Sequence, residues 1–137
     1  MHYQEVLRID TRGRGTVDVT DRVAQVVTRA GAPVGLCTLF IRHTSASLIV
    51  SENADPDVLR DLETLISRLV PDGDKAYRHD AEGPDDMPAH VRSVLTATSL
   101  AVPITGGKLA LGTWQAVYLW EHRHQPHRRE IVVHVAA

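Results

Sequence analysis

The spacing of apolar positions divides the chain into segments with strand-like and helix-like periods. Residues 4–9 and 16–20 favour strands, and the Gly-rich turn between them predicts that these two strands pair with each other. From Thr20 onward the period becomes that of an amphipathic helix, with Thr20 or Asp21 as its cap and Gly31 at its end. The apolar positions that indicate this helix are Val23, Val26, Val27 and Ala30.

The central part of the sequence predicts one long strand and a second helix. Residues 36–50 are rich in β-branched and apolar side chains, which favours a central strand with a bend at the Ser-Ala-Ser segment 45–47. Alternation along this strand places Cys37, Leu39, Ile41 and His43 on one face. Residues 55–69 predict a helix with proline in its first turn. Its apolar positions are Val58, Leu59, Leu62, Leu65, Ile66 and Leu69.

The last third of the chain predicts a short helix and three strands. The helix is expected to start near Pro84 or Asp85, with an apolar stripe at Met87, His90, Val91, Val94 and Leu95. Strands are expected at 98–104, 108–120 and 130–135, with a Gly-Gly hairpin turn before the second and a polar loop, 122–129, before the third. We therefore expect an α+β fold, in which residues 1–137 form a single compact domain with a mostly antiparallel β-sheet and about three helices.

Composition narrows the classes of function. The 137 residues are 43% hydrophobic and 23% charged, which is typical of one globular domain. A net charge of -2 gives no electrostatic reason to expect binding to nucleic acid or to an anionic membrane. The single cysteine, Cys37, excludes an intrachain disulfide and is expected to be a core residue, and no apolar run has the length of a membrane span. We expect a cytoplasmic protein without an export signal.

Three histidines are the first candidates for chemistry. His79 and His90 lie in a polar segment, residues 77–90, and His43 ends the apolar face of the predicted central strand. A histidine directed into the core needs partners for its ring nitrogens, and a shared metal ion such as zinc is one possible partner. No diagnostic metal-binding spacing is present, so ordinary hydrogen bonds to carbonyls or to nearby aspartates are the simpler interpretation. The residues alone leave both interpretations open.

Two further polar segments are candidates for a site. Glu52 and Asn53 directly follow the predicted bent strand, where a carboxylate can act as a general base, although a solvated loop is the simpler interpretation. Asp55 is expected to cap the following helix. The loop 122–129 carries three arginines and three histidines and is either a solvated hairpin loop or a patch that binds phosphate.

These segments together resemble the YjbQ family, whose members are described as secondary thiamine-phosphate synthases or as proteins of unknown function. The resemblance extends over nearly the whole chain. Its most specific parts are HTSASL at 43–48, ENADPDV at 52–58, EGPDDMPAH at 82–90 and EHRHQPHRR at 121–129. Tyr77 with His79, and the segment VPITGGKLALGTWQ, add to the match, with Ala116 in place of a usual glycine.

The resemblance implies a compact α+β domain that forms a homotrimer, with the polar motifs in a pocket near the subunit contacts. It implies metal ligation by His43, His79 and His90, with zinc, or magnesium with a diphosphate substrate, as the divalent ion. It implies catalytic positions at Glu52, Asn53, Asp86, Glu121 and Arg128, with Gln115 in support.

The implied reaction joins hydroxymethylpyrimidine diphosphate to a thiazole phosphate, as a weak or secondary activity on small phosphorylated metabolites. Such a reaction needs cationic groups for the departing diphosphate, for which the ion, Arg123 and Arg128 are the candidates. Two alternatives remain open. One is a metal-dependent hydrolase of a small phosphorylated or acylated metabolite with Glu52 as base, and the other is a non-catalytic trimer that binds a metabolite or a metal.

Overall fold

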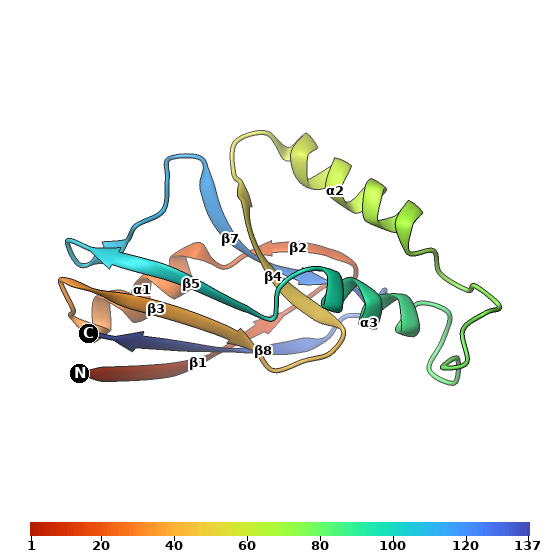
Figure 1. Ribbon diagram of the computed structural model, residues 1–137, viewed down its shortest axis with the longest axis horizontal. Coiled ribbons are helices and arrows are strands. Elements are labelled where there is room, and N and C mark those ends of the chain that lie inside the picture. Colours follow the sequence, from red (N-terminus) through yellow and green to blue (C-terminus); the bar gives the residue numbers. More distant parts are fainter.

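The computed structural model describes all 137 residues, 1–137, as one domain of eight strands and three helices (Figure 1). The strands are β1 (His2–Asp10), β2 (Gly15–Asp18), β3 (Val34–Ile41), β4 (Ala46–Glu52), β5 (Ser99–Thr105), β6 (Lys108–Leu109), β7 (Gln115–Glu121) and β8 (Arg128–Ala136). The helices are α1 (Thr20–Ala30), α2 (Pro56–Leu69) and α3 (Asp86–Leu95). The predicted α+β class with a mostly antiparallel sheet and three helices is confirmed.

The strands form two antiparallel sheets rather than one. The larger sheet has the order β1-β8-β3-β5-β6, and the smaller has the order β2-β7-β4. The predicted pairing of the first two strands is wrong, because β1 pairs with β8 and β2 pairs with β7. The chain changes sheets after β1, where the backbone N–H of Thr11 donates to the carbonyl of His127 and the Thr11 hydroxyl donates to Glu121.

The predicted strand 36–50 is two strands, β3 in the larger sheet and β4 in the smaller one. Residues 42–45 separate them. At the break the backbone N–H of Glu130 donates to the imidazole of His43, which replaces a backbone acceptor at the end of the β3–β8 ladder. The predicted strand 108–120 is likewise divided into β6 and β7, and the polar loop is shorter than expected because β8 begins at Arg128.

The core lies between the two sheets and α1, and the predicted inward residues of α1 and β3 are confirmed there. Val23, Val26 and Val27 of α1 are buried with Cys37, Leu39 and Ile41 of β3. Gly31 ends α1 in the left-handed region, at φ 73°, and donates its N–H to the carbonyl of Val27. The predicted cap of α1 is wrong, since the carboxylate of Asp18 accepts the N–H of Thr20.

Helices α2 and α3 lie to one side of the sheets and are held largely by polar contacts (Figure 1). Most positions of their apolar stripes are exposed or half-buried in the single chain. In α2 only Ile66 is buried, while Leu65 is 65% and Leu69 70% exposed. In α3, Ala89 and Arg92 are buried, and Val94 is 83% exposed.

A buried arginine explains this arrangement of the two helices. Arg92 of α3 is fully buried and donates to Glu63 at 2.6 Å and to Ser67 at 2.9 Å, both on α2. The indole N–H of Trp120, on β7, donates to the same glutamate at 3.2 Å. Because these charged and polar groups occupy the contact, the face of α3 that carries Arg92 turns inward although it is not the most apolar one. None of the three helices is long and apolar enough to cross a membrane.

Candidate metal centre

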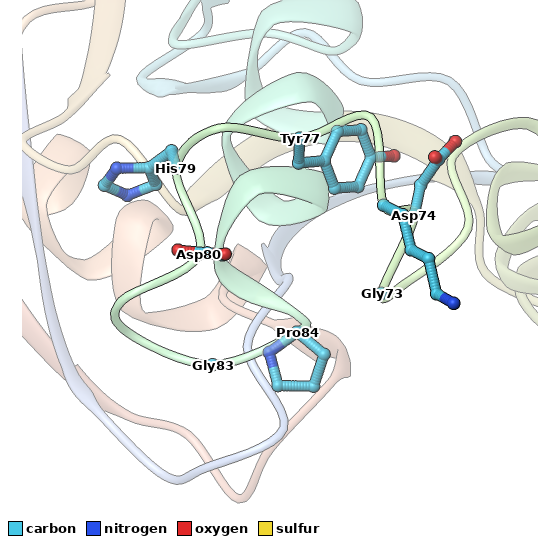
Figure 2. A pocket seen from close by; sticks show the side chains of 8 residues that line it. Gly73, Asp74, Tyr77, His79, Asp80, Gly83 and Pro84 are labelled. Carbon is cyan, nitrogen blue, oxygen red and sulfur yellow. The ribbon is translucent and has the colours of Figure 1, made fainter.

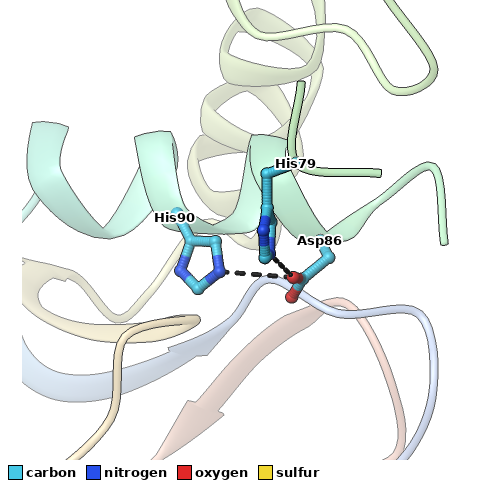
Figure 3. Close-up of side chains that lie close together, drawn as sticks. All are labelled: His79, Asp86 and His90. Carbon is cyan, nitrogen blue, oxygen red and sulfur yellow. Dashed lines mark hydrogen bonds and ion pairs between the residues drawn. The ribbon is translucent and has the colours of Figure 1, made fainter. Parts of the chain in front are cut away.

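Three side chains from α3 and the segment before it meet at one point. Asp86 and His90 stand four residues apart in the first half of α3, so they lie on the same side of the helix. His79 comes from the polar segment that precedes α3 and turns back towards them (Figure 3). The Oδ2 atom of Asp86 lies 2.6 Å from Nε2 of His79 and 3.3 Å from Nε2 of His90. One ligand atom from each of the three side chains lies within 4.8 Å of the others.

The hydrogen bond from Nδ1 of His90 determines whether its second ring nitrogen, Nε2, is a donor or an acceptor. Its Nδ1 lies 2.9 Å from the carbonyl oxygen of Thr44, which can only accept, so Nδ1 carries a proton. In a neutral imidazole, Nε2 is then an acceptor, and it faces an acceptor oxygen of Asp86. Two acceptors at this distance require a cation between them, which is either a second proton on the ring or a metal ion.

Only one carboxylate oxygen of Asp86 faces the two histidines. Its Oδ1 accepts from Arg123 at 2.8 Å, which leaves Oδ2 for the histidines. Burial acts to raise the pKa of Asp86, but the hydrogen bond with His79 and the positive charges of His90 and Arg123 outweigh it and lower the pKa. Asp86 is therefore an ionised carboxylate with a fixed orientation. Arg123 also donates to Asp85 at 3.0 Å and to the carbonyl of Glu82 at 2.8 Å, so its guanidinium is fully engaged.

The cluster is open to solvent on the side of the histidines. The side chain of Asp86 is only 2% exposed, whereas that of His79 is 48% and that of His90 is 30% exposed. A cavity of about 390 Å³ adjoins His79 and is shaped by the polar segment itself (Figure 2). Its lining residues are Gly73, Asp74, Lys75, Tyr77, His79, Asp80, Gly83 and Pro84.

The donor set fits a divalent cation. Nitrogen and carboxylate ligands of zinc lie about 2.0–2.2 Å from the ion, and two such ligands in tetrahedral geometry are about 3.4 Å apart. The contact between His90 and Asp86 already has about this length, while the shorter contact between His79 and Asp86 would have to open slightly. Three protein ligands leave a fourth position for water or substrate, which is the pattern of catalytic rather than structural zinc sites.

His43 is not a member of this group. Its Nε2 accepts the N–H of Glu130 at 2.7 Å, so the lone pair that would bind a metal is already in use. Burial and the positive charge of Arg129 lower the pKa of His43, which keeps the ring neutral. The structure thus brings together two of the three predicted histidine ligands, and Asp86 takes the third place.

Glu52, Asn53 and Gln115 lie at the other end of the smaller sheet. The start of β4 contacts α3 through a hydrogen bond from Ser93 to the carbonyl of Ala46. Glu52 ends the same strand, and six strand residues span about 20 Å. The carboxylate of Glu52 accepts the N–H of Asp55, and Asn53 donates to the carbonyl of Thr113. These contacts stabilise the loops before α2 and β7, and Asp55 caps α2 as predicted, by accepting the N–H of Asp57.

Glu121 has a structural position. It is fully buried and accepts hydrogen bonds from the Thr11 hydroxyl, from the guanidinium of Arg129 and from the backbone N–H groups of His122 and Arg123. Burial acts to raise its pKa, but the bonds from Arg129 and Thr11 outweigh this and lower the pKa.

The side chain of Arg128 lies on the exposed surface of the larger sheet and is not part of the cluster. Its side chain is 68% exposed and pairs with Asp10 at 3.1 Å on neighbouring strands. Its neighbour Arg129 is the buried arginine of this segment, since successive strand residues face opposite sides. The alternating apolar residues of β8 could have identified Arg129, because it lies in phase with Ile131 and Val133.

Sequence reasoning also missed His122, which is fully buried. Its Nε2 lies 2.8 Å from the hydroxyl of Ser47, and no protein atom is within hydrogen-bonding distance of its Nδ1. Burial, followed by the charges of Arg92 and Arg14, lowers the pKa of His122 to about 3. This histidine is neutral at all ordinary pH values.

The fold and the cluster define a class: a small α+β protein with two antiparallel sheets and an open His–Asp–His group on its third helix. The family model described as UPF0047 protein YjbQ-like matches residues 5–137. The chain belongs to the UPF0047 (YjbQ-like) family.

Relatives and solved structures agree with this assignment. The chain is 55% identical over 134 residues to a UPF0047 protein of Synechocystis sp., covering 98% of this chain and 91% of the relative. It is 42% identical over 133 residues to the UPF0047 protein YjbQ of Escherichia coli O157:H7, covering 96% of each. A YbjQ-like protein of unknown function from Sulfolobus solfataricus superimposes with a TM-score of 0.88 at 26% identity, over 98% of this chain and 96% of that one.

Proposed function

We propose that the protein is a metal-dependent enzyme that holds a divalent cation, zinc or a related ion, between His79, Asp86 and His90. The observation that supports this most directly is the pair of facing acceptors, Nε2 of His90 and Oδ2 of Asp86, at 3.3 Å. A cation between them removes their repulsion and satisfies both. Two histidines and one carboxylate, with an open position, form a ligand set of hydrolytic zinc enzymes.

Hydrolysis of a small phosphorylated metabolite is the reaction that we favour. A bound divalent ion supplies a water molecule of lowered pKa and neutralises charge on phosphate oxygens. Around it, Arg123 fixes Asp86 and the Thr44 carbonyl fixes the ring of His90, so that the ligands keep their orientation. The cavity beside His79 would hold the substrate, with Lys75 as its cationic group and the carboxylate of Asp80 as a candidate base.

The synthase reaction that the resemblance implies is the second candidate. It needs positive charge for the departing diphosphate, and the two candidate arginines are already in ion pairs. Arg123 is neutralised by Asp85 and Asp86, and Arg128 pairs with Asp10 on the larger sheet. Arg123 is therefore not free to bind a departing diphosphate, and Arg128 belongs to an exposed ion pair outside the cluster. The ion itself would therefore have to carry the charge of the leaving group.

We further propose that the protein acts as a homotrimer, because within one chain the candidate residues Glu52 and Asn53 lie at the other end of the smaller sheet from the cluster. The strand β4 spans about 20 Å between Ala46, whose carbonyl contacts α3, and Glu52 at its other end. If these residues serve the same site as His79 and His90, a neighbouring subunit has to supply them. The loop 110–114 beside them exposes Trp114, a large apolar side chain suited to a contact between subunits.

The experiment is an assay of purified protein stripped with a chelator and then loaded with zinc, manganese or magnesium. Phosphate release is measured from a panel of phosphomonoesters, and thiamine phosphate formation from the pyrimidine diphosphate and thiazole phosphate pair. His124→Ala is the matched control, because His124 is an exposed histidine that pairs with Asp72 outside the cluster. We expect metal-dependent phosphate release by wild type and His124→Ala, and a loss of at least 100-fold in His90→Ala.

The other outcomes decide between the candidates. Thiamine phosphate formation that is lost in His90→Ala, without phosphate release from single substrates, would favour the synthase. Binding of the ion with no turnover of either kind would leave a metal-binding protein and refute the enzymatic proposal.

A further inference from the structure

The side chain of Arg123, just after β7, makes one hydrogen bond to each of three groups around the start of α3. Its Nε donates to Oδ2 of Asp85 at 3.0 Å, its Nη1 to Oδ1 of Asp86 at 2.8 Å and its Nη2 to the carbonyl oxygen of Glu82 at 2.8 Å. The side chain is only 14% exposed, so these three contacts hold the guanidinium in one position. Arg123 therefore joins the proposed ligand Asp86 to the segment that carries the proposed ligand His79.

Asp85 holds Arg123 in this position and gives up another role to do so. It precedes the first residue of α3, where an aspartate side chain usually accepts a backbone N–H of the first helical turn, but it makes no such hydrogen bond. Its Oδ2 accepts from Arg123 and, at 2.9 Å, from the backbone N–H of His124. Burial acts to raise the pKa of Asp85, but these two hydrogen bonds outweigh it and lower the pKa to about 2. Asp85 is thus a buried, ionised partner of Arg123 rather than a helix cap.

The position of Arg123 limits how Asp86 can bind an ion. Oδ2 of Asp86 faces the ring nitrogens of His79 and His90, whereas Oδ1 is bonded to the guanidinium. An ion that used both oxygens would share Oδ1 with Arg123, and the two positive charges would repel each other strongly in a site with little water. The side chain of Asp86 is only 2% exposed, and a rotation that turned both oxygens to the ion would break its bond to Arg123. Asp86 can therefore bind with Oδ2 alone.

Divalent ions differ in what they need from a carboxylate. Zinc is most often tetrahedral, so two imidazoles, one carboxylate oxygen and one water molecule complete its coordination. Calcium takes more oxygen ligands and often both oxygens of one carboxylate, and manganese prefers octahedral sites that are rich in oxygen. An aspartate restricted to one oxygen therefore suits zinc and leaves manganese short of its preferred ligands.

We propose that Arg123, held by Asp85, determines the metal specificity of the site: it selects zinc over manganese because it prevents Asp86 from binding with both oxygens. Neither residue is a ligand. Both act through Asp86 and are positioning residues. The inference rests on the metal site proposed above and goes beyond it, because it assigns the choice of ion to two residues outside the group of ligands.

A purely structural role of Arg123 would have a different effect on binding. If Arg123 only stabilised the start of α3, its loss would disorder the ligands and weaken the binding of zinc and manganese alike. If it keeps Oδ1 of Asp86 from the ion, its loss gives manganese a further oxygen ligand, which zinc does not need. The ratio of the two dissociation constants, rather than either constant alone, therefore distinguishes the two roles.

The test measures the dissociation constants of zinc and manganese by isothermal calorimetry on chelator-stripped, full-length protein. The variants are Arg123→Met and the double variant Asp85→Asn with Arg123→Met. The double variant removes one charge of each sign, so Asp85 is not left as a buried charge without compensation, and asparagine can still accept the N–H of His124. Arg128→Met is the matched control, because Arg128 belongs to an exposed ion pair outside the cluster. Circular dichroism checks that each variant is folded, and a crystal structure of zinc-loaded wild type gives a result that needs no variant.

We expect the ratio of the manganese to the zinc dissociation constant to fall about tenfold or more in both Arg123 variants and to stay within about threefold of wild type in Arg128→Met. In zinc-loaded wild type, only Oδ2 of Asp86 should contact the ion. An unchanged ratio in the Arg123 variants, an equal fall in Arg128→Met, or zinc bonded to both oxygens of Asp86 would overturn this inference and leave the metal site itself intact. A wild type that binds neither ion would refute the metal site, and this inference with it.

Discussion

Replacement of Glu121 by glutamine separates a structural role of this residue from a catalytic one. Glutamine keeps the shape of the side chain but removes its negative charge. Arg129, whose side chain is only 5% exposed, then loses its counter-charge. The new amide also brings a donor to a point where Thr11 and the backbone N–H groups of His122 and Arg123 already donate.

The magnitude follows from the burial of this pair. Removing one partner of a buried ion pair costs about 3–5 kcal/mol, because the other charge stays buried without compensation. A domain of this kind has a free energy of unfolding of about 5–15 kcal/mol, so the loss is a large share of the total. At about 4 °C per kcal/mol for a chain of this length, the melting temperature of Glu121→Gln should fall by roughly 10–20 °C.

The assay is thermal unfolding followed by circular dichroism, with Arg128→Gln as control. Arg128 pairs with Asp10 on the exposed side of the same strand, and exposed pairs contribute about 0–1 kcal/mol. Its loss should therefore shift the melting temperature by no more than about 4 °C. Below its melting temperature, Glu121→Gln should bind zinc as wild type does.

The pH dependence adds a second check. Because the pKa of Glu121 is lowered in the folded state, its contribution is complete above the ordinary value of 4.5 and is lost as the pH falls through the lowered value. The difference between wild type and Glu121→Gln should hold at pH 5 and shrink at more acidic pH. A melting temperature within 3 °C of wild type at pH 7 would refute the reasoning.

Three further predictions concern single residues. In wild type the free energy of unfolding should decline from about pH 6.5 towards pH 3, by up to ~1.4 kcal/mol per pH unit. The reason is that His122 gains a proton in the unfolded chain, whereas in the folded chain its pKa is lowered to about 3 and it stays neutral. Urea titrations should show a shallower decline in His122→Gln. Asp55→Ala should lower the unfolding free energy by about 1 kcal/mol, since the N–H of Asp57 loses its acceptor, and an unchanged urea midpoint would contradict this. Gly13→Ala should lower the melting temperature, because φ is 113° there and a Cβ atom would lie 2.6 Å from the carbonyl oxygen of His124; equal melting temperatures would show that the loop can shift.

Local patterns in the sequence were sufficient for most elements. The helical period of α1 and α2, the turn at Gly31 and the cap at Asp55 depend on residues close together in the chain, and these predictions are confirmed. The division of residues 36–50 into β3 and β4 was not predictable in this way. It depends on a hydrogen bond from Glu130 to His43, between residues far apart in the sequence.

The face of α3 that is buried could likewise not be predicted from local patterns in the sequence. Apolar periodicity favoured Val91 and Val94 as the inner face, whereas the structure buries Arg92, because Glu63 and Ser67 of α2 accept hydrogen bonds from its two terminal nitrogens. The resemblance, rather than periodicity, pointed to Asp86 as a site residue. The proximity of His79 to His90 was likewise beyond local patterns, since it requires the polar segment to fold back on α3.

The central claim is that His79, Asp86 and His90 hold one divalent ion. The measurement that tests it most directly is a zinc titration by isothermal calorimetry on chelator-stripped, tag-free protein, with alanine variants of these three residues and His43→Ala for comparison. We predict one zinc ion per chain in wild type and in His43→Ala, and a loss of at least 100-fold in affinity in each of the other three variants. A wild type that binds no zinc, or a His43→Ala variant that loses zinc while Asp86→Ala retains it, would contradict the account.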